Sequence, residues 1–237
     1  MQPEPGGIAM YPLQRHQLVW LDARAWQRVL AASSESSPRD PQALECLQHW
    51  ADRDLPLVVT RQPHGWSGHR GDEALALGVA APLCWGRRRL FVEARVADVR
   101  RRGRFPHACD ISAMLPPQAI DGWTALCIAL ETLGAEIRVY GSHGWQQLTG
   151  LACLRDGSDI DLLVDIDSPR QADAAVAMLK RVPFSTPRLD GELVFSHGRA
   201  VAWREWAKWR AGGTTQLLIK DLHGATLENG HGWAVAA

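Results

Sequence analysis

One stretch of the sequence constrains the fold more than any other, because it joins two apolar runs through a Gly-Ser turn. The first run covers residues 137–140, and Gly141-Ser142 follows it directly. The second run, residues 159–165, begins Asp-Ile-Asp-Leu. Residues two apart on a strand project from the same face. We therefore expect Asp159 and Asp161 to point together toward one spot, while the apolar residues between them enter the core.

This pair of carboxylates suggests metal and phosphate chemistry. Two like charges held so close repel each other unless a cation lies between them. Mg²⁺ prefers oxygen ligands and binds through one or two carboxylates together with substrate phosphates. Gly141 lets a phosphate approach the backbone, and Ser142 adds a hydroxyl and an N–H at the positive end of a helix. We expect Asp159 and Asp161 to hold Mg²⁺, with Gly141 and Ser142 contacting the substrate.

The charge balance and cysteine spacing exclude several classes of protein. The 26 basic and 26 acidic side chains cancel, so no overall field attracts nucleic acid or an anionic membrane. The sequence has neither a signal-like N-terminus nor about 18 consecutive apolar residues, as a membrane span requires. Five cysteines lie far apart without a CxxC pair, which is typical of reduced thiols rather than a disulfide framework. We expect a cytoplasmic protein that binds neither nucleic acid nor membrane.

Punctuation by proline divides the chain into two parts. Pro116-Pro117 is well placed to open a helix, because the missing N–H would be unpaired there. The boundary is expected near residue 115, giving domains 1–115 and 116–237. Apolar runs of β-forming residues and one helical stretch predict a small α+β unit for the first domain. The expected strands are 18–21, 57–60 and 90–92, and the expected helix is 25–32.

The second domain shows helical and strand periods in alternation. Apolar residues recur at three- and four-residue spacing from Ile120 to Leu133, and Gly134 supplies a stop. A further helix is expected over 171–181, with Asp167 or Ser168 as its cap. The turn Ser-His-Gly-Arg at 196–199 predicts a hairpin over 193–203.

The order of strand, Gly-Ser, helix and Asp-h-Asp-h strand resembles the DNA-polymerase-β-like nucleotidyltransferase superfamily. That resemblance implies an α+β fold whose C-terminal domain has a mixed sheet with flanking helices, and a third carboxylate on another strand. Sixteen residues separate Ser142 from Asp159, more than is usual in the superfamily, so an extra turn is expected between them.

Several further segments carry a narrower resemblance. They are Tyr140-Gly141-Ser142, Trp145-Gln146, Leu148-Thr149-Gly150, residues 158–163, residues 191–195 and residues 200–206. With these segments the chain resembles, over nearly its whole length, the phosphoribosyl-dephospho-CoA transferases of malonate decarboxylase, also called holo-acyl-carrier-protein synthases. The resemblance implies transfer of the prosthetic group from 2'-(5''-triphosphoribosyl)-3'-dephospho-CoA to a serine of the apo acyl carrier protein subunit, with release of pyrophosphate.

The third carboxylate is expected at Glu192, which begins the next candidate strand. Asp190, just before that strand, and Glu205, just after the following one, stay open as alternatives. A solvated strand end is the other interpretation of Glu192. Asp165 lies near the far end of its strand and is left out of the site. The candidates for binding phosphates are Arg204, Lys208, Arg210 and Lys220.

Two other functions fit the same residues. One is a nucleotidyltransferase that adenylylates another protein or a small molecule. The other is a non-catalytic binding module in which the aspartate pair is a solvated strand end. His143 sits on the turn, where a lone histidine is typically a surface hydrogen-bonding group, and no Ser-His-Asp spacing indicates a hydrolase.

Overall fold

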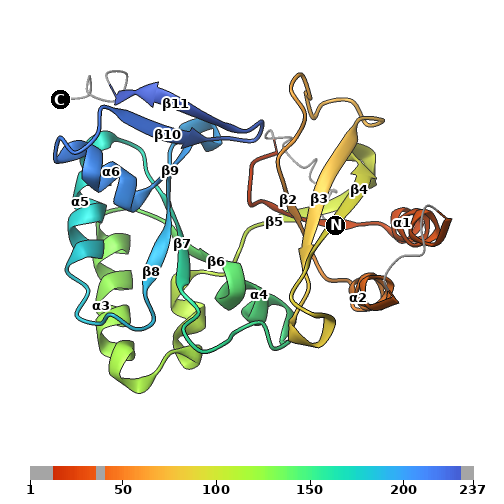
Figure 1. Cartoon of the computed structure of the whole chain (residues 1–237), viewed down its shortest axis with the longest axis horizontal. Coiled ribbons are helices and arrows are strands. Elements are labelled where there is room, and N and C mark those ends of the chain that lie inside the picture. Colours follow the sequence, from red (N-terminus) through yellow and green to blue (C-terminus); the bar gives the residue numbers. More distant parts are fainter. Residues whose placement is uncertain (1–12, 36–40, 231–237) are drawn as a thin grey trace, which may run out of the picture.

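The computed structural model describes residues 13–35 and 41–230 and has two β-sheets, each with its own helices (Figure 1). The expected α+β class is confirmed. The two sheets lie side by side, and residues 104–107 run from the last strand of the first sheet to the second domain (Figure 1). Of the helices in the described ranges, none has the length and apolar composition needed to cross a bilayer.

The N-terminal sheet is antiparallel throughout, with strand order β4-β3-β2-β1-β5. Its two helices pack against each other. The strand runs expected from the sequence are present, whereas α2, β3 and β5 were not predicted. The elements are β1 (Leu18–Leu21), α1 (Ala23–Glu35), α2 (Pro41–Asp52), β2 (Leu57–Val59), β3 (Ala74–Ala80), β4 (Arg89–Arg95) and β5 (Val99–Gly103), with 3₁₀ turns η1 (Leu83–Trp85) and η2 (Val96–Asp98).

The C-terminal sheet is mixed, with strand order β11-β10-β9-β8-β7-β6 and one parallel pair, β7 and β8. Helices α3 and α5 cover the face turned away from the first domain, and α4 lies on the other side (Figure 1). The elements are η3 (Ala108–Met114), α3 (Pro117–Thr132), β6 (Ile137–Tyr140), α4 (Gly141–Thr149), β7 (Ile160–Asp165), α5 (Pro169–Lys180), β8 (Leu189–Val194), η4 (Ser196–Gly198), β9 (Ala200–Ala202), α6 (Trp203–Arg210), β10 (Gln216–Lys220) and β11 (Ala225–Asn229).

Local signals explain where the helices flanking the C-terminal sheet begin and end. Pro117 occupies the first turn of α3, and Gly134 follows that helix with φ +78°, a conformation glycine adopts at no steric cost. Ser168 caps α5, because its hydroxyl accepts a hydrogen bond from the Gln171 N–H at 3.2 Å. The expected hairpin forms from β8, η4 and β9.

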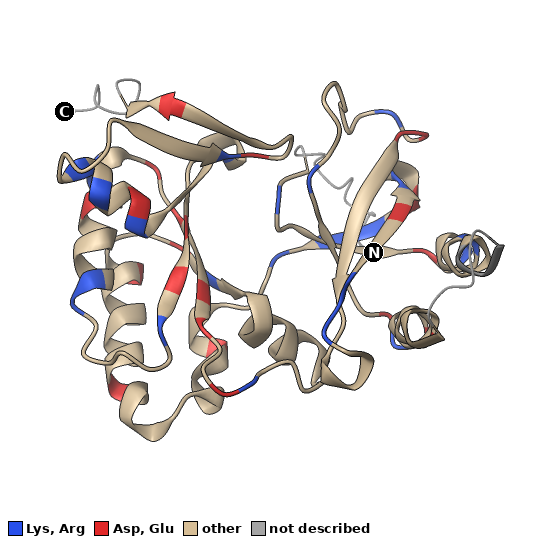
Figure 2. Cartoon of the chain, in the orientation of Figure 1, with Lys and Arg blue, Asp and Glu red and all other residues tan. Residues whose placement is uncertain are grey.

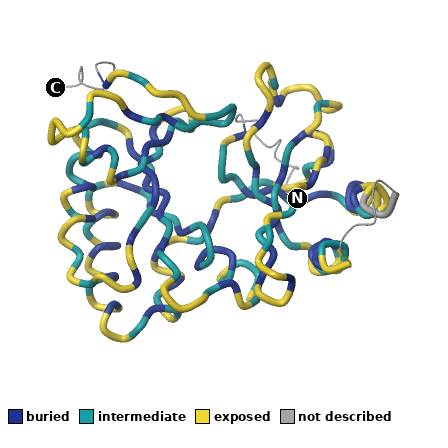
Figure 3. Tube along the Cα trace, in the orientation of Figure 1, coloured by how far each residue is buried: buried dark blue, intermediate teal, exposed yellow. Residues whose placement is uncertain are grey.

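Two buried clusters form the cores of the two sheets, and the change from one to the other falls between Phe105 and Ala108. Buried residues concentrate on the central strands of both sheets (Figure 3). Trp145 and Cys153 belong to the C-terminal half of the chain, yet they pack in the N-terminal cluster. The boundary near residue 115 stays a prediction.

Candidate active site

A row of three polar side chains crosses one face of the C-terminal sheet. Tyr140 on β6 is the register partner of Asp161 on β7, and Asp161 is the register partner of Asp190 on β8. Side chains of register partners lie on the same face of a sheet. Ile160 and Leu162, which alternate with Asp161, are completely buried on the helix-covered side. Acidic positions therefore gather on β7 and β8 (Figure 2).

The Gly-Ser corner touches this row directly. Gly141 follows β6 as the first residue of α4 and has φ +63°. A Cβ atom on Gly141 would lie 1.9 Å from the Asp161 Oδ2 atom, so the carboxylate rests on the glycine itself. Gly144 is equally constrained, since a Cβ there would lie 2.2 Å from the Val139 carbonyl oxygen. The sequence places glycine where α4 must approach both β6 and the acidic strand.

Replacing Gly141 by alanine should displace the Asp161 carboxylate and lower turnover by roughly 10²-fold, the scale expected when a reacting group shifts by about 1 Å. Gly150→Ala is the matched control. Gly150 has nearly the same backbone strain, φ +69°, with nothing near its missing Cβ. We expect the Gly150 variant to lose about 1 kcal/mol of stability and keep its turnover. Equal turnover losses in the two variants would contradict the role assigned to Gly141.

Asp161 is an electrostatically unfavourable carboxylate. Burial, together with the negative charges of Asp190 and Asp159, raises its pKa to about 6. Its side chain makes no hydrogen bond or ion pair within residues 13–35 and 41–230. A carboxylate held in this way gains most from a bound cation.

Asp159 lies just before β7 and has a different environment. Its carboxylate accepts hydrogen bonds from Arg188, with Nη2–Oδ2 at 2.5 Å and Nε–Oδ1 at 3.2 Å. The Arg188 contact holds the pKa of Asp159 below its usual range. Arg188 Nη2 is also 3.9 Å from Asp190 Oδ2, so one guanidinium bridges two of the three carboxylates. The described part of the chain has no group of three or more His, Cys, Asp or Glu side chains that could hold a metal ion by themselves.

The first turn of α4 also positions Asp159. Ser142 is half-buried in that turn, behind Gly141. His143 is buried rather than on the surface, and its Nδ1 atom lies 3.1 Å from the Asp159 carbonyl oxygen. Burial lowers the pKa of His143, which favours the neutral ring at this contact. The surface position expected for this histidine was wrong, because α4 turns it inward toward the start of β7.

The segment between Ser142 and Asp159 is fixed from both ends. The Gln146 Oε1 atom accepts hydrogen bonds from the Cys153 and Leu154 N–H groups. The expected extra turn lies at Asp156 and Gly157. The Leu83 N–H, in the N-terminal domain, donates to the Ala152 carbonyl at 3.0 Å.

Glu192 lies on the same face of β8 as Asp190, but its partners come from elsewhere. Arg15 Nη1 and Nη2 lie 2.5 and 3.1 Å from its carboxylate oxygens, and Lys220 Nζ lies at 2.8 Å. His16 Nε2 is 3.6 Å away. Burial alone would raise the pKa of Glu192, but the contacts with His16, Arg15 and Lys220 hold it well below the usual range. The carboxylate thus ties a segment of the N-terminal domain to β8 and β10.

Sequence reasoning ranked Asp190 behind Glu192 and did not find Arg188. Asp190 was visible as an acidic residue two positions before Glu192, but its alignment with Asp161 depends on the parallel register of β7 and β8. Gly191 allows that register, because a Cβ there would lie 2.1 Å from the Leu162 carbonyl oxygen. Arg188 carries no sequence signal of its own, since it precedes the strand in an irregular segment.

A Gly-Ser corner against one acidic strand, with a further carboxylate in register on the next strand, is typical of nucleotidyltransferase domains. Two family models match the chain and narrow this class. Residues 107–231 match the phosphoribosyl-dephospho-CoA transferase MdcG C-terminal domain, and residues 14–105 match the MdcG N-terminal domain. The chain belongs to the phosphoribosyl-dephospho-CoA transferase MdcG family and is a transferase.

Curated relatives match over nearly the full length of both chains. A phosphoribosyl-dephospho-CoA transferase of Xanthomonas campestris pv. campestris (strain 8004) is 35% identical over 90% of this chain and 92% of its own. One from Xanthomonas axonopodis pv. citri is 36% identical over 87% of this chain and 90% of its own. One from Bradyrhizobium diazoefficiens is 31% identical over 93% of this chain and 92% of its own. No solved structure matches the chain significantly.

Proposed function

We propose that this transferase moves the phosphoribosyl-dephospho-CoA group from 2'-(5''-triphosphoribosyl)-3'-dephospho-CoA to a serine of the apo acyl carrier protein of malonate decarboxylase. The serine oxygen forms a bond to the phosphorus that carries the ribose, the bond from that phosphorus to the diphosphate breaks, and pyrophosphate leaves. The serine proton passes to solvent or to a nearby base. The observation that carries this proposal is the Asp161 carboxylate resting on Gly141 within a chain matched along both domains by one transferase family.

We propose Mg²⁺ as the cofactor, held at the carboxylates of Asp159 and Asp161. The fit rests on Asp161, whose raised pKa and lack of a hydrogen-bonding partner among the described residues mark a carboxylate that a cation would stabilise. Asp161 and Asp159 would hold the ion together with substrate phosphate oxygens, as is usual for Mg²⁺, and Asp190 would be the third carboxylate of the site. When bound, Mg²⁺ would neutralise charge on the triphosphate. The N–H groups at the start of α4, at Gly141 and Ser142, would contact the leaving pyrophosphate.

For the third carboxylate we favour Asp190 over Glu192. Asp190 is in register with Asp161 and its charge acts on Asp161. Glu192 already has Arg15 and Lys220 as partners, and a metal ion would have to replace both. Glu205, the other alternative, accepts a hydrogen bond from the Leu218 N–H at 2.9 Å, which favours a structural role.

A cytoplasmic location, where thiols stay reduced, is consistent with the five free cysteines.

Intact-protein mass spectrometry of the carrier protein tests this function. We expect the apo carrier protein to gain the mass of the phosphoribosyl-dephospho-CoA group when it is incubated with the transferase, the triphosphoribosyl donor and Mg²⁺. The gain should disappear with excess EDTA and return when Mg²⁺ is added back. A carrier protein whose acceptor serine is replaced by alanine is the control.

The outcomes separate the competing functions. Transfer of an adenylyl group from ATP to another acceptor, without loading of the carrier protein, would favour the adenylylating enzyme. An absence of transfer from either donor would favour the binding module. Loading that persists unchanged in EDTA would contradict the metal assignment while leaving the transfer itself intact.

A further inference from the structure

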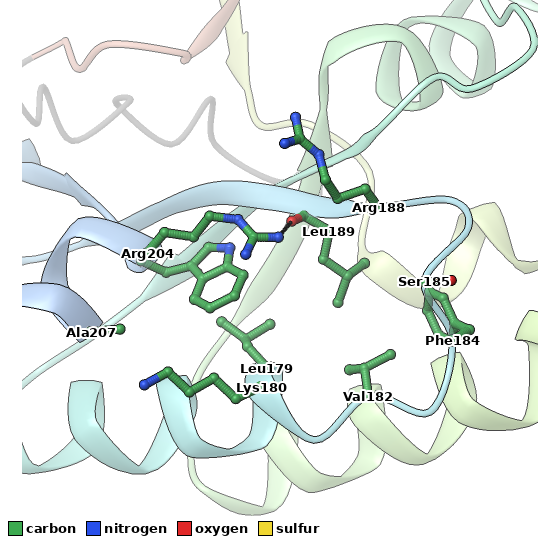
Figure 4. Close-up of a pocket in the computed structure, with 10 residues that line it drawn as sticks. Leu179, Lys180, Val182, Phe184, Ser185, Arg188, Leu189, Arg204 and Ala207 are labelled. Atoms are coloured by element: carbon green, nitrogen blue, oxygen red, sulfur yellow. Dashed lines mark hydrogen bonds between the residues drawn. The ribbon is translucent and has the colours of Figure 1, made fainter.

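A pocket of about 470 Å³ lies between the end of α5, the 182–189 segment and the start of α6. Arg188, which lines it, contacts Asp159, so the pocket adjoins the acidic site formed by Asp159, Asp161 and Asp190. Its volume lies within the range of ligand-binding pockets, roughly 300–1,000 Å³. Leu179, Val182 and Phe184 supply apolar and aromatic surface, and Phe184 remains half-exposed (Figure 4). The pocket can therefore accept a flat apolar group.

Three cations line the same pocket. Lys180 is exposed and has no ion pair within the described ranges. Arg204 reaches across toward β8, where its Nη2 atom donates to the Leu189 carbonyl at 2.8 Å (Figure 4). Arg188 turns its guanidinium away from Val182 and Phe184, consistent with its contact to Asp159 (Figure 4). Positive charge next to apolar surface suits an anionic ligand that also carries an aromatic ring.

Trp203 adds a donor without an acceptor. Its side chain lines the pocket and is 4% exposed, with the Arg204 guanidinium 4.3 Å above the ring. Its Nε1 atom is buried and has no hydrogen-bond partner among the residues the structure describes. A buried indole N–H normally finds a partner, and a ligand with acceptor atoms would provide one.

We propose that this pocket binds the adenosine diphosphate portion of the dephospho-CoA moiety. The inference rests on the proposed function and deepens it by locating this part of the donor. The purine packs against Phe184 and the pocket's apolar surface, and the diphosphate contacts Lys180 and Arg204. The purine ring and the two phosphates together match the apolar surface, the cations and the unpartnered Trp203 N–H. The uncharged pantetheine arm would leave the cations without a ligand.

Arg188 connects this pocket to the acidic site. Its side chain is 59% exposed, so it can turn from Asp159 to a phosphate at the pocket mouth. That exchange would release the Asp159 carboxylate when the donor arrives. The ion pair between Arg188 and Asp159 is then a competitor of the ligand phosphate, and removing Asp159 should strengthen nucleotide binding.

Calorimetric titration of the full chain with 3'-dephospho-CoA, without carrier protein, tests the pocket. Lys180→Ala and Arg204→Ala should each weaken binding by about tenfold or more, as expected for loss of a charge-assisted hydrogen bond. Arg181→Ala is the matched control, since Arg181 follows Lys180 at the end of α5 but is outside the pocket lining and should leave affinity within about twofold. ADP should compete with dephospho-CoA, and pantetheine should not.

The opposite results overturn the assignment. Unchanged affinity in the Lys180→Ala variant would place the nucleotide elsewhere. Displacement of dephospho-CoA by pantetheine as effectively as by ADP would do the same. Asp159→Asn should tighten binding in the parent chain and have no effect in an Arg188→Ala background, and equal effects in both backgrounds overturn the exchange at Arg188. Carrier loading by the wild type is scored separately, so failure of the pocket and failure of the proposed function are distinguishable.

Discussion

Asp161→Asn is expected to lower the rate of carrier-protein loading by roughly 10³-fold, in line with the loss of a charged group that stabilises a transition state. The stability of the folded protein should not decrease. The pKa of Asp161 is raised to about 6 by burial and by neighbouring carboxylates, so its ionised form destabilises the native state above that pH. At pH 8 the thermal midpoint of the variant should equal or exceed that of the wild type. Loading kinetics and calorimetry on the same preparations measure both effects.

Asp165→Asn is the matched control for this substitution. Asp165 lies on the same strand and the same face as Asp161, but its carboxylate pairs with Arg104 instead of facing Gly141. Its loss should leave loading within a few-fold of the wild type. A lower midpoint for Asp161→Asn at pH 8, or equal losses of loading in the two variants, would show that Asp161 serves the fold rather than the chemistry.

Glu192→Gln is expected to lower the free energy of unfolding by about 3 kcal/mol. This is the lower end of the range for breaking a buried ion pair, because Arg15 and Lys220 retain some contact with water. Urea unfolding at pH 7 measures the loss. Glu228→Gln is the control, since that carboxylate pairs with Arg199 at the surface and should contribute about 0.5 kcal/mol or less.

The stability difference between wild type and Glu192→Gln should depend on pH with a defined sign. The pKa of Glu192 is lower in the folded than in the unfolded protein, so its stabilisation is fully present above the usual value of 4.5 and is lost as pH falls below it. The difference should therefore narrow as pH falls from 5 toward 3. A variant with normal stability but greatly reduced loading would instead restore Glu192 as the third catalytic carboxylate.

The parts of the fold that the sequence predicts are those decided by local signals. The first strand and β6 match their expected ranges, and α3 begins at its proline pair and ends two residues before its glycine. Helix α2 was missed although it buries Cys46, Leu47 and Trp50, whose helical spacing was not recognised. Strands β10 and β11 were missed because their pairing is set by contact with each other and with β9.

The site was predictable only as far as neighbours along the chain determine it. Gly141 and Asp161 could be matched because a strand, a turn and a returning strand must bring their ends together. The partners of Asp159 and Glu192 could not, since Arg188, Arg15 and Lys220 approach from other segments, up to 177 positions away for Arg15. Residue type alone does not tell whether a carboxylate faces a metal ion or a guanidinium.

The packing of Trp145 and Cys153 into the N-terminal cluster, together with the hydrogen bond from Leu83 to Ala152, limits how this protein can be rearranged by recombination. The segment between the Gly-Ser corner and Asp159 packs against the N-terminal domain. A gene fusion that transplanted residues from 107 onward would carry the chemical groups of the site. It would also expose the Trp145 indole and the Cys153 thiol to water. The two halves therefore depend on each other for the burial of these side chains, despite having separate sheets.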